Sequence, residues 1–316
     1  MSLTFVLRKP DVKLKFQTTF PNLAVFIKGK LLAPPLTNNY SLVGTAFDYL
    51  LRFYIERLNP NAIIDKWVAE YVAEHPPDDI EVSLKCVKIV EEAKMARSEY
   101  LKSGTITETL LKSVIGLAQI DNLYRSGKID AHLGSVEMWD MMDLMKLISS
   151  IDPTSFKAKE ICVLNPTFGK GSTLVGGADA DLIIDDLLID IKTTQFQCLT
   201  DDHFHQIIGY YTLYKIGGID GVPPHHEIKR LGVYSSRYAC LHIVKVEDII
   251  DFKTYPQFLN WFKESNRINN IIDAAESEDK RINNIIDAAE SEDKISKKTA
   301  KKTAKSDLGE RPKRKT

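Results

Sequence analysis

The chain has 316 residues, 44% hydrophobic and 27% charged, a composition typical of a globular protein with a sizeable core. The net charge of −1 is uneven, because residues 295–316 hold nine Lys/Arg against two Asp/Glu and leave −8 on the remainder. Such an acidic body argues against a protein that coats DNA without sequence preference. No long apolar run predicts a membrane span.

The cysteines argue against a zinc or iron–sulfur centre. Four of them lie far apart along the chain, and no C-x-x-C pair occurs. This spacing fits a reduced cytosolic environment. The N-terminus lacks a signal-peptide pattern, so we expect a cytoplasmic protein.

The first half of the chain is predicted to be mostly helical. Residues 1–40 are expected to form short strands and turns, with one strand over Leu23–Ile27. Apolar residues recur at helical spacing from Val43 to Leu58, and Asn59-Pro60 ends that helix. The pattern stays helical from 61 to 151 and predicts a helical insertion. Its expected helices are Ile63–Val72, Ile80–Leu101, Thr107–Tyr124 and Val136–Ile148.

The segment after the insertion is predicted to build most of a central sheet. We expect strands over Cys162–Leu164 and Ser172–Val175, a hairpin over 181–192, and late strands over Leu231–Tyr234 and Tyr238–Val244. A helix is expected over Asp202–Tyr214, and a short helix with Phe258, Trp261 and Phe262 closes the fold. The expected fold class is α/β, with a central mixed sheet flanked by helices.

The C-terminal part differs in character from this predicted domain over 1–265. Residues 266–294 contain a perfect tandem repeat, because Arg267–Lys280 recurs unchanged as Arg281–Lys294. A short coiled coil is one interpretation, but two short units cannot build a repeat core alone, so we favour a tandem duplication. Residues 295–316 form a basic low-complexity tail that we expect to be disordered. The tail either binds DNA through counterion release or serves as a solubilising end.

The most informative motif is the predicted hairpin. Two apolar segments, 181–184 and 189–192, are joined by a tight turn at Asp185-Asp186. Side chains two apart in a strand share a face, so Asp190 and Lys192 point the same way, and the hairpin brings Asp181 beside them. Carboxylates hold Mg²⁺ through hard oxygen ligands, and a neighbouring lysine orients water or stabilises charge on phosphate. This combination is typical of metal-assisted phosphodiester hydrolysis.

The helix after the hairpin carries a second pair of polar residues. Gln206 and Tyr210 are four apart, so they lie on one helical face. Their amide and hydroxyl groups offer hydrogen bonds to DNA phosphate or to waters on a metal.

The order Asp181, then Asp190-x-Lys192, then Gln206-x-x-x-Tyr210 resembles the PD-(D/E)XK nuclease superfamily. The Gln-x-x-x-Tyr helix is similar to that of the RecB-like branch. Members commonly have a Gly-Thr-x-x-His helix, and here Gly44-Thr45-Ala46-Phe47-Asp48 stands in that place. The resemblance implies a restriction-endonuclease-like core, divalent metal dependence and nucleic-acid cleavage.

The resemblance also implies roles for individual residues. Asp181 and Asp190 would ligate Mg²⁺ or Mn²⁺, with the carbonyl of Ile191 as a further oxygen ligand. Lys192 would position the attacking water or help to deprotonate it. Asp179 shares a strand face with Asp181 and is the alternative ligand, although the apolar continuation after Asp181 matches the motif better.

The first predicted helix carries a polar line of Asp48, Arg52 and Glu56 at a spacing of four. One interpretation is a solvated ion-pair stripe of little energetic weight. The other makes Asp48 a third acidic ligand, and the sequence leaves both open.

The leading functional hypothesis is a Mg²⁺- or Mn²⁺-dependent deoxyribonuclease, with an exonuclease slightly preferred by the Gln-x-x-x-Tyr analogy. The expected partners are DNA and a separate helicase or recombination protein. One alternative is a non-catalytic nucleic-acid-binding or assembly protein that retains the nuclease fold. The other is a restriction-type endonuclease whose helical insertion contacts bases.

Overall fold

The computed structural model describes residues 2–128 and 132–268. Its contacts divide the chain into two compact units, Met1–Leu259 and Asn260–Thr316. The first unit contains every predicted site residue. The second lies mostly outside the described residues, as do nearly all of the 266–294 repeat and the whole 295–316 tail.

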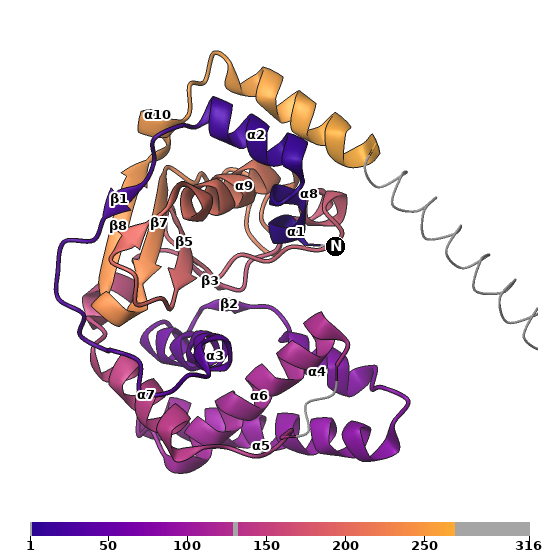
Figure 1. Ribbon diagram of the computed structural model, residues 1–316, viewed down its shortest axis with the longest axis vertical. Coiled ribbons are helices and arrows are strands. Elements are labelled where there is room, and N and C mark those ends of the chain that lie inside the picture. The colour runs from indigo at the N-terminus through magenta and orange to yellow at the C-terminus, as the bar shows by residue number, and fades with distance from the viewer. Residues whose placement is uncertain (1, 129–131, 269–316) are drawn as a thin grey trace, which may run out of the picture. The chain divides into compact units, whose positions relative to one another are not determined.

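A six-stranded mixed sheet lies at the centre of the first unit (Figure 1). In spatial order its strands are β2 (Ile63–Ile64), β3 (Cys162–Leu164), β4 (Leu182–Ile184), β5 (Leu187–Lys192), β7 (Arg230–Ser235) and β8 (Cys240–Lys245). Strands β3, β4 and β5 form an antiparallel meander, whereas β7 runs parallel to β5 and antiparallel to β8. Strands β1 (Val25–Phe26) and β6 (Cys198–Leu199) pair separately. The predicted mixed sheet flanked by helices is therefore confirmed.

Helices cover both faces of this sheet (Figure 1). One face carries α9 (Asp201–Gly217), which packs against α1 (Leu3–Leu7), α2 (Pro10–Thr19) and α8 (Lys170–Leu174). The other face carries α3 (Tyr40–Leu58) and a helical block of α4 (Val68–Glu74), α5 (Ile80–Ser103), α6 (Glu108–Ser126) and α7 (Met138–Ser149). Shorter elements are η1 (Pro153–Phe156), η2 (Ser236–Tyr238) and α10 (Val246–Ile249), and residues 255–268 are helical. No helix among the described residues combines the length and the apolar character needed to cross a membrane.

The ribbon formed by β4 and β5 is apolar on both faces. Leu182 and Ile189 belong to the core that continues into α3 and the helical block. Ile183 and Leu188 are equally buried but point to the opposite face, because successive side chains of a strand alternate. Burial on both faces explains why these strands contain near-continuous aliphatic runs.

The helical block begins and ends its long helices at ordinary capping signals. The side chain of Asp79 accepts the N–H of Val82 at the start of α5, and Thr107 does the same for Leu110 at the start of α6. Gly104 and Gly127 end the two helices in the left-handed conformation. These boundaries agree closely with the helices predicted over 80–101 and 107–124.

The prediction of short strands and turns over 1–40 is wrong for the first half of that segment, which forms α1 and α2. Ser2 accepts the N–H of Phe5 and caps α1, and Pro10 occupies the first turn of α2, where its missing N–H costs nothing. Val12 and Phe16 lie four apart and are both buried. The strand expected near Leu23–Ile27 is present as β1.

Two further expectations are wrong. The helix predicted from Ile63 begins only at Val68, because Ile63 and Ile64 pair in parallel with β3. The strand predicted over 172–175 is helix α8 instead. Gly171 packs directly on α9, where a Cβ would clash with the backbone carbonyl of Leu213. Close packing of the two helices thus outweighs the local sequence pattern that predicted a strand.

A buried ion pair joins the helical block to the sheet. Arg237, in the turn between β7 and β8, donates to both carboxylate oxygens of Asp143 on α7, at 2.8 and 3.0 Å. It also donates to the carbonyl of Ala33 at 2.9 Å. Arg237 is 1% exposed and the Asp143 side chain is fully buried. The planar guanidinium thus satisfies three acceptors at the point where block and sheet meet.

We expect Arg237→Ala to lower the free energy of unfolding by about 3–5 kcal/mol, because it leaves the Asp143 carboxylate buried without its cation. Urea unfolding followed by circular dichroism measures this loss. The matched control is Lys112→Ala, which removes a cation from an exposed pair with Glu108 and should change stability little. Equal losses in the two variants would contradict a special role for the buried pair.

Candidate active site

The β4–β5 ribbon brings the predicted acidic and basic groups to one end of the sheet. The pairing of Leu182 with Ile189 places Asp181, the residue before β4, opposite Asp190. Asp190 is 1% exposed, and one of its oxygens lies 2.6 Å from Nζ of Lys192. The two side chains meet because they are two apart on one strand. All three groups therefore converge on one face.

The turn of the ribbon is held in place by Asp185, which has a positive φ of 52°. Its carboxylate accepts the backbone N–H groups of Lys159, Glu160 and Ile161 at 2.8–3.1 Å. Partial burial raises the pKa of Asp185, but these three N–H groups outweigh it and hold the pKa below its usual value. The loop before β3 thereby fixes the hairpin.

The backbone of Ile191 contributes to the same site. Its N–H donates to Oδ2 of Asp181 at 2.5 Å. The N–H and C=O of one strand residue point to the same edge, and successive residues alternate. The Lys192 carbonyl accepts from Ser236 on the β7 side, so the Ile191 carbonyl faces the edge where Asp181 lies. The Ile191 carbonyl is the one that the sequence resemblance implied as a ligand.

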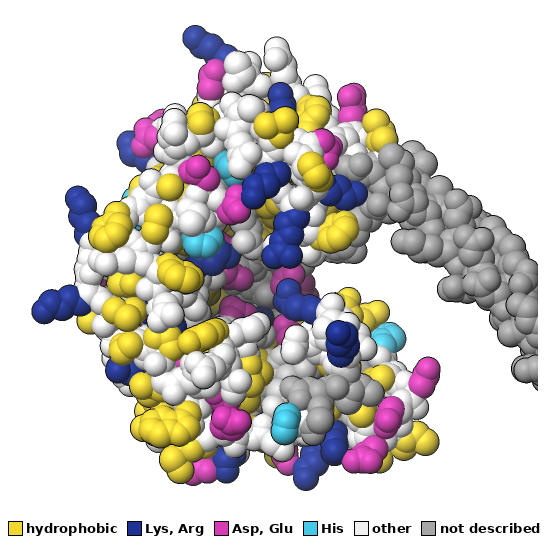
Figure 2. Space-filling model, in the orientation of Figure 1, with side chains coloured by type: hydrophobic (Ala, Val, Ile, Leu, Met, Phe, Trp, Pro, Cys, Tyr) yellow, Lys and Arg dark blue, Asp and Glu magenta, His cyan; other side chains and the backbone are white. Residues whose placement is uncertain are grey.

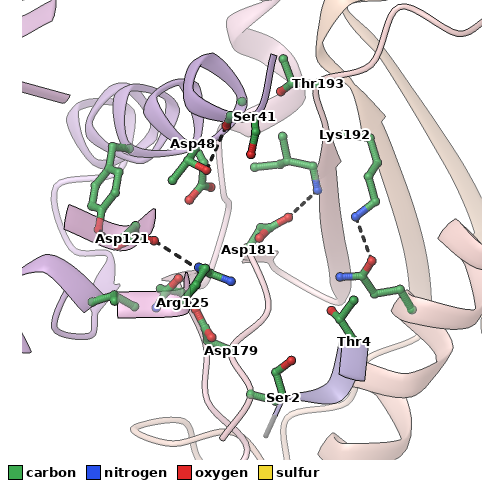
Figure 3. A pocket seen from close by; sticks show the side chains of 18 of the residues that line it. Ser2, Thr4, Ser41, Asp48, Asp121, Arg125, Asp179, Asp181, Lys192 and Thr193 are labelled. Carbon is green, nitrogen blue, oxygen red and sulfur yellow. Dashed lines mark hydrogen bonds and ion pairs between the residues drawn. The ribbon is translucent and has the colours of Figure 1, made fainter. Parts of the chain in front are cut away.

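A cavity of about 530 Å³ opens at this end of the sheet (Figure 3). One wall comes from β5, α9 and the N-terminal segment, and the other comes from α3 and α6. Its polar and charged lining residues include Ser2, Thr4, Asp48, Tyr49, Arg52, Asp121, Arg125, Asn165, Asp179, Asp181, Lys192, Gln206 and Tyr210. The space-filling view shows the surface hollowed here, with side chains of both charges facing the opening (Figure 2). Asp190 lies behind the wall, against Lys192.

The carboxylates around this cavity are short of positive charge. Burial, reinforced by Asp190 and Asp48, raises the pKa of Asp181 well above its usual range. Burial likewise raises the pKa of Asp48 and that of Asp121. A carboxylate in a poorly hydrated place favours its neutral form unless a cation compensates it. A bound cation would stabilise the ionised form of these carboxylates.

Lys192 connects the ribbon to α9. Its Nζ donates to Oε1 of Gln206 at 3.0 Å, and the Gln206 amide donates to the hydroxyl of Tyr210 at 3.3 Å. Burial lowers the pKa of Lys192, but Asp190 and Asp181 outweigh it and hold the pKa above its usual value. The group is therefore an ammonium ion at neutral pH. Of the two roles implied for Lys192, this favours orienting water or phosphate over deprotonating water.

The polar line on α3 is not a solvated stripe, so that interpretation is wrong. Arg52 is 6% exposed and pairs with Asp48 at 2.6 Å, and Glu56 pairs with Arg97 of α5. Oδ1 of Asp48 is buried and has no hydrogen-bond partner among the described residues. Asp48 lines the cavity on the wall opposite the ribbon. Its role as a third ligand stays a prediction.

Sequence reasoning missed the contribution of α6. Asp121 accepts the hydroxyl of Tyr49 at 2.7 Å, and its other oxygen lies 3.4 Å from the guanidinium of Arg125. Both α6 side chains line the cavity (Figure 3). Their only sequence signal is a spacing of four, which is common in solvated helical pairs.

The donor set fits a hard divalent cation by its chemistry. Within the described residues, no group of three or more His, Cys, Asp and Glu residues is arranged to hold a metal ion unaided. The candidate oxygens come from Asp181, Asp48 and Ile191, which line the cavity, and from Asp190 behind its wall. Oδ1 of Asp48 and Oδ2 of Asp190 are buried without a hydrogen bond, although the latter keeps its ion pair with Lys192. Such oxygens are the ligands that Mg²⁺ and Mn²⁺ prefer.

Asp179, the alternative ligand, also lines the cavity. Asp181 differs in that its carboxylate accepts the N–H of Ile191, which places it on the ribbon itself.

Comparison with protein-family models, with curated proteins and with solved structures found no match.

We expect Asp181→Asn to raise the free energy of unfolding by about 1 kcal/mol at pH 7 without added metal. The folded-state pKa of Asp181 is raised, so ionising it opposes folding. The cost is absent below the unfolded pKa, grows as pH rises toward the folded pKa, and persists above it. Thermal melting from pH 4 to pH 8 measures the difference.

The same melting experiment tests cation binding. Mg²⁺ or Mn²⁺ should raise the melting temperature of the wild type, because a ligand of the native state stabilises it, and Asp181→Asn should reduce that rise. Asp78→Asn, at an exposed position, is the matched control and should respond like the wild type. An equal metal-induced rise in all three proteins would remove Asp181 from the ligand set.

Proposed function

We propose that this chain is a divalent-metal-dependent nuclease that hydrolyses DNA phosphodiester bonds. The observation that carries the proposal is the convergence of Asp181 and Lys192, which line one cavity, with Asp190, which lies behind its wall against Lys192. The antiparallel meander, the α9 crossover and the parallel strand β7 support a restriction-endonuclease-like core of the RecB-like type. Assignment to that superfamily is part of the proposal.

The residues of the chain have distinct tasks in this proposal. Asp181, Asp190 and the Ile191 carbonyl would hold Mg²⁺ or Mn²⁺, with Asp48 as a further oxygen donor. The ion, when bound, supplies Lewis-acid polarisation of a phosphate and a more acidic bound water. The Lys192 ammonium stabilises negative charge that develops on the phosphate.

Helix α9 positions this machinery. Gln206 accepts a hydrogen bond from Lys192 and donates one to Tyr210, so it fixes the orientation of the ammonium group. Burial, followed by the charges of Asp181 and Asp190, raises the pKa of Tyr210 well above its usual value, so its hydroxyl keeps its proton. An exonuclease is preferred, by analogy of the Gln-x-x-x-Tyr helix, and a separate helicase or recombination protein is the proposed partner.

We expect the purified protein to degrade DNA with Mg²⁺ and to leave it intact in EDTA. Lys192→Ala should lower the rate by at least about 10²-fold, because charge on the phosphate loses its preorganised partner. Asp190→Asn should do the same through loss of a metal ligand. Gel assays on linear, circular, single- and double-stranded DNA measure these rates and separate exonuclease from restriction-type cleavage.

The matched control is Lys253→Ala, which removes an exposed lysine outside the cavity. It should retain the wild-type rate, and circular dichroism should show native secondary structure in every variant. Undiminished cleavage by both Lys192→Ala and Asp190→Asn would defeat the proposal.

A second candidate is a non-catalytic nucleic-acid-binding protein with the same fold. It is favoured by the lack, within residues 2–128 and 132–268, of a self-sufficient metal cluster of side chains. In that case Mn²⁺ would leave the melting temperature unchanged, while DNA would still bind.

A further inference from the structure

Arg125 is the cation of the cavity best placed to meet an incoming anion. It projects from the last turn of α6 toward the ribbon, between Asp121 and Asp179 (Figure 3). Its side chain is 64% exposed, and its ion pair with Asp121 is long, at 3.4 Å. A guanidinium can offer five N–H donors, and a single long contact leaves most of them to solvent or ligand.

The other two cations of the lining are already engaged. Arg52 is buried and donates to the side chains of Asp48 and Asn165 and to a backbone carbonyl. Lys192 pairs with Asp190 at 2.6 Å and donates to Gln206. Redirecting Arg52 would leave buried acceptors without a donor, which costs more than a surface contact contributes. Lys192 has three N–H donors and uses two of them, so one is left for the phosphate at the proposed reaction site.

Asp121, the ion-pair partner of Arg125, is itself held in place. Asp121 is 3% exposed, and the Tyr49 hydroxyl holds its second oxygen at 2.7 Å. One edge of the guanidinium is therefore held by Asp121, while the rest of the group stays exposed to solvent. Anchored arginines with an open edge suit phosphate, whose oxygens accept paired N–H donors.

We propose that Arg125 binds a backbone phosphate of the substrate strand across the cavity from Lys192, so that the helical block supplies half of the substrate site. This rests on the proposed nuclease function. The strand would lie between the ribbon, where the chemistry takes place, and α6, which holds a phosphate next to the bond to be cleaved. The helical insertion would thus be part of the substrate site.

The test measures DNA binding apart from cleavage. Fluorescence anisotropy of a labelled single-stranded oligonucleotide in EDTA, where a metal-dependent nuclease leaves DNA intact, gives affinity over a range of salt concentrations. Arg125→Ala should weaken binding about tenfold, and the slope of log affinity against log salt should fall by about 0.7 for the one lost phosphate contact. Arg125→Lys should retain that slope, because a point charge remains.

The matched control is Lys112→Ala, which removes a cation from the same helix outside the cavity. It should leave both affinity and slope unchanged. In Mg²⁺, Arg125→Ala should raise KM with little change in kcat, as loss of uniform substrate binding predicts. Equal affinity and equal slope in Arg125→Ala and Lys112→Ala would overturn the assignment.

The outcomes separate this inference from the function on which it rests. If binding depends on Arg125 but Mg²⁺ produces no cleavage, the proposed nuclease function is wrong and the role of Arg125 in phosphate binding stands. If the wild type cleaves DNA and Arg125→Ala has an unchanged KM, the role of Arg125 is wrong and the nuclease function stands. A wild type that neither binds nor cleaves DNA would end both.

Discussion

A carboxylate buried in an apolar sheet requires a cation, and for Asp190 that cation is Lys192 at 2.6 Å. Asp190 alternates with aliphatic neighbours along β5, so its side chain cannot turn toward solvent without breaking the strand. Lys192 in turn is held by Gln206, which ties the pair to α9. The direction of the ammonium group is therefore set by Asp190 on one side and by Gln206 of α9 on the other.

The cavity lies between two groups of elements that share one continuous core on one face of the sheet. The ribbon and α9 form one wall, and α3 with the helical block forms the other. The buried bidentate contact between Arg237 and Asp143 joins the helical block to the turn between β7 and β8. A buried pair of this kind is costly to form, and loss of either partner would leave an uncompensated buried charge.

Much of the ribbon could be predicted from sequence, because its signals are local. Two apolar runs around Asp185-Asp186 identify the hairpin, and a spacing of two places Asp190 with Lys192. The spacing of Gln206 and Tyr210 places both on one face of α9. What escaped prediction depends on distant contacts. The helix at 170–174 follows from close packing on α9, and the short strand β2 exists only through its pairing with β3.

The facing wall escaped prediction for the same reason. Nothing within α6 distinguishes Asp121 and Arg125 from an ordinary surface pair, and their importance appears only when Tyr49 and the cavity are in place. An acidic body that carries −8 outside residues 295–316 would repel a polyanion at long range. Under the proposed nuclease function, attraction would come from a few cations that line the cavity and from a metal ion that offsets the carboxylates. In that proposal the Arg125 guanidinium would supply such a cation without a large desolvation cost, because its side chain is 64% exposed.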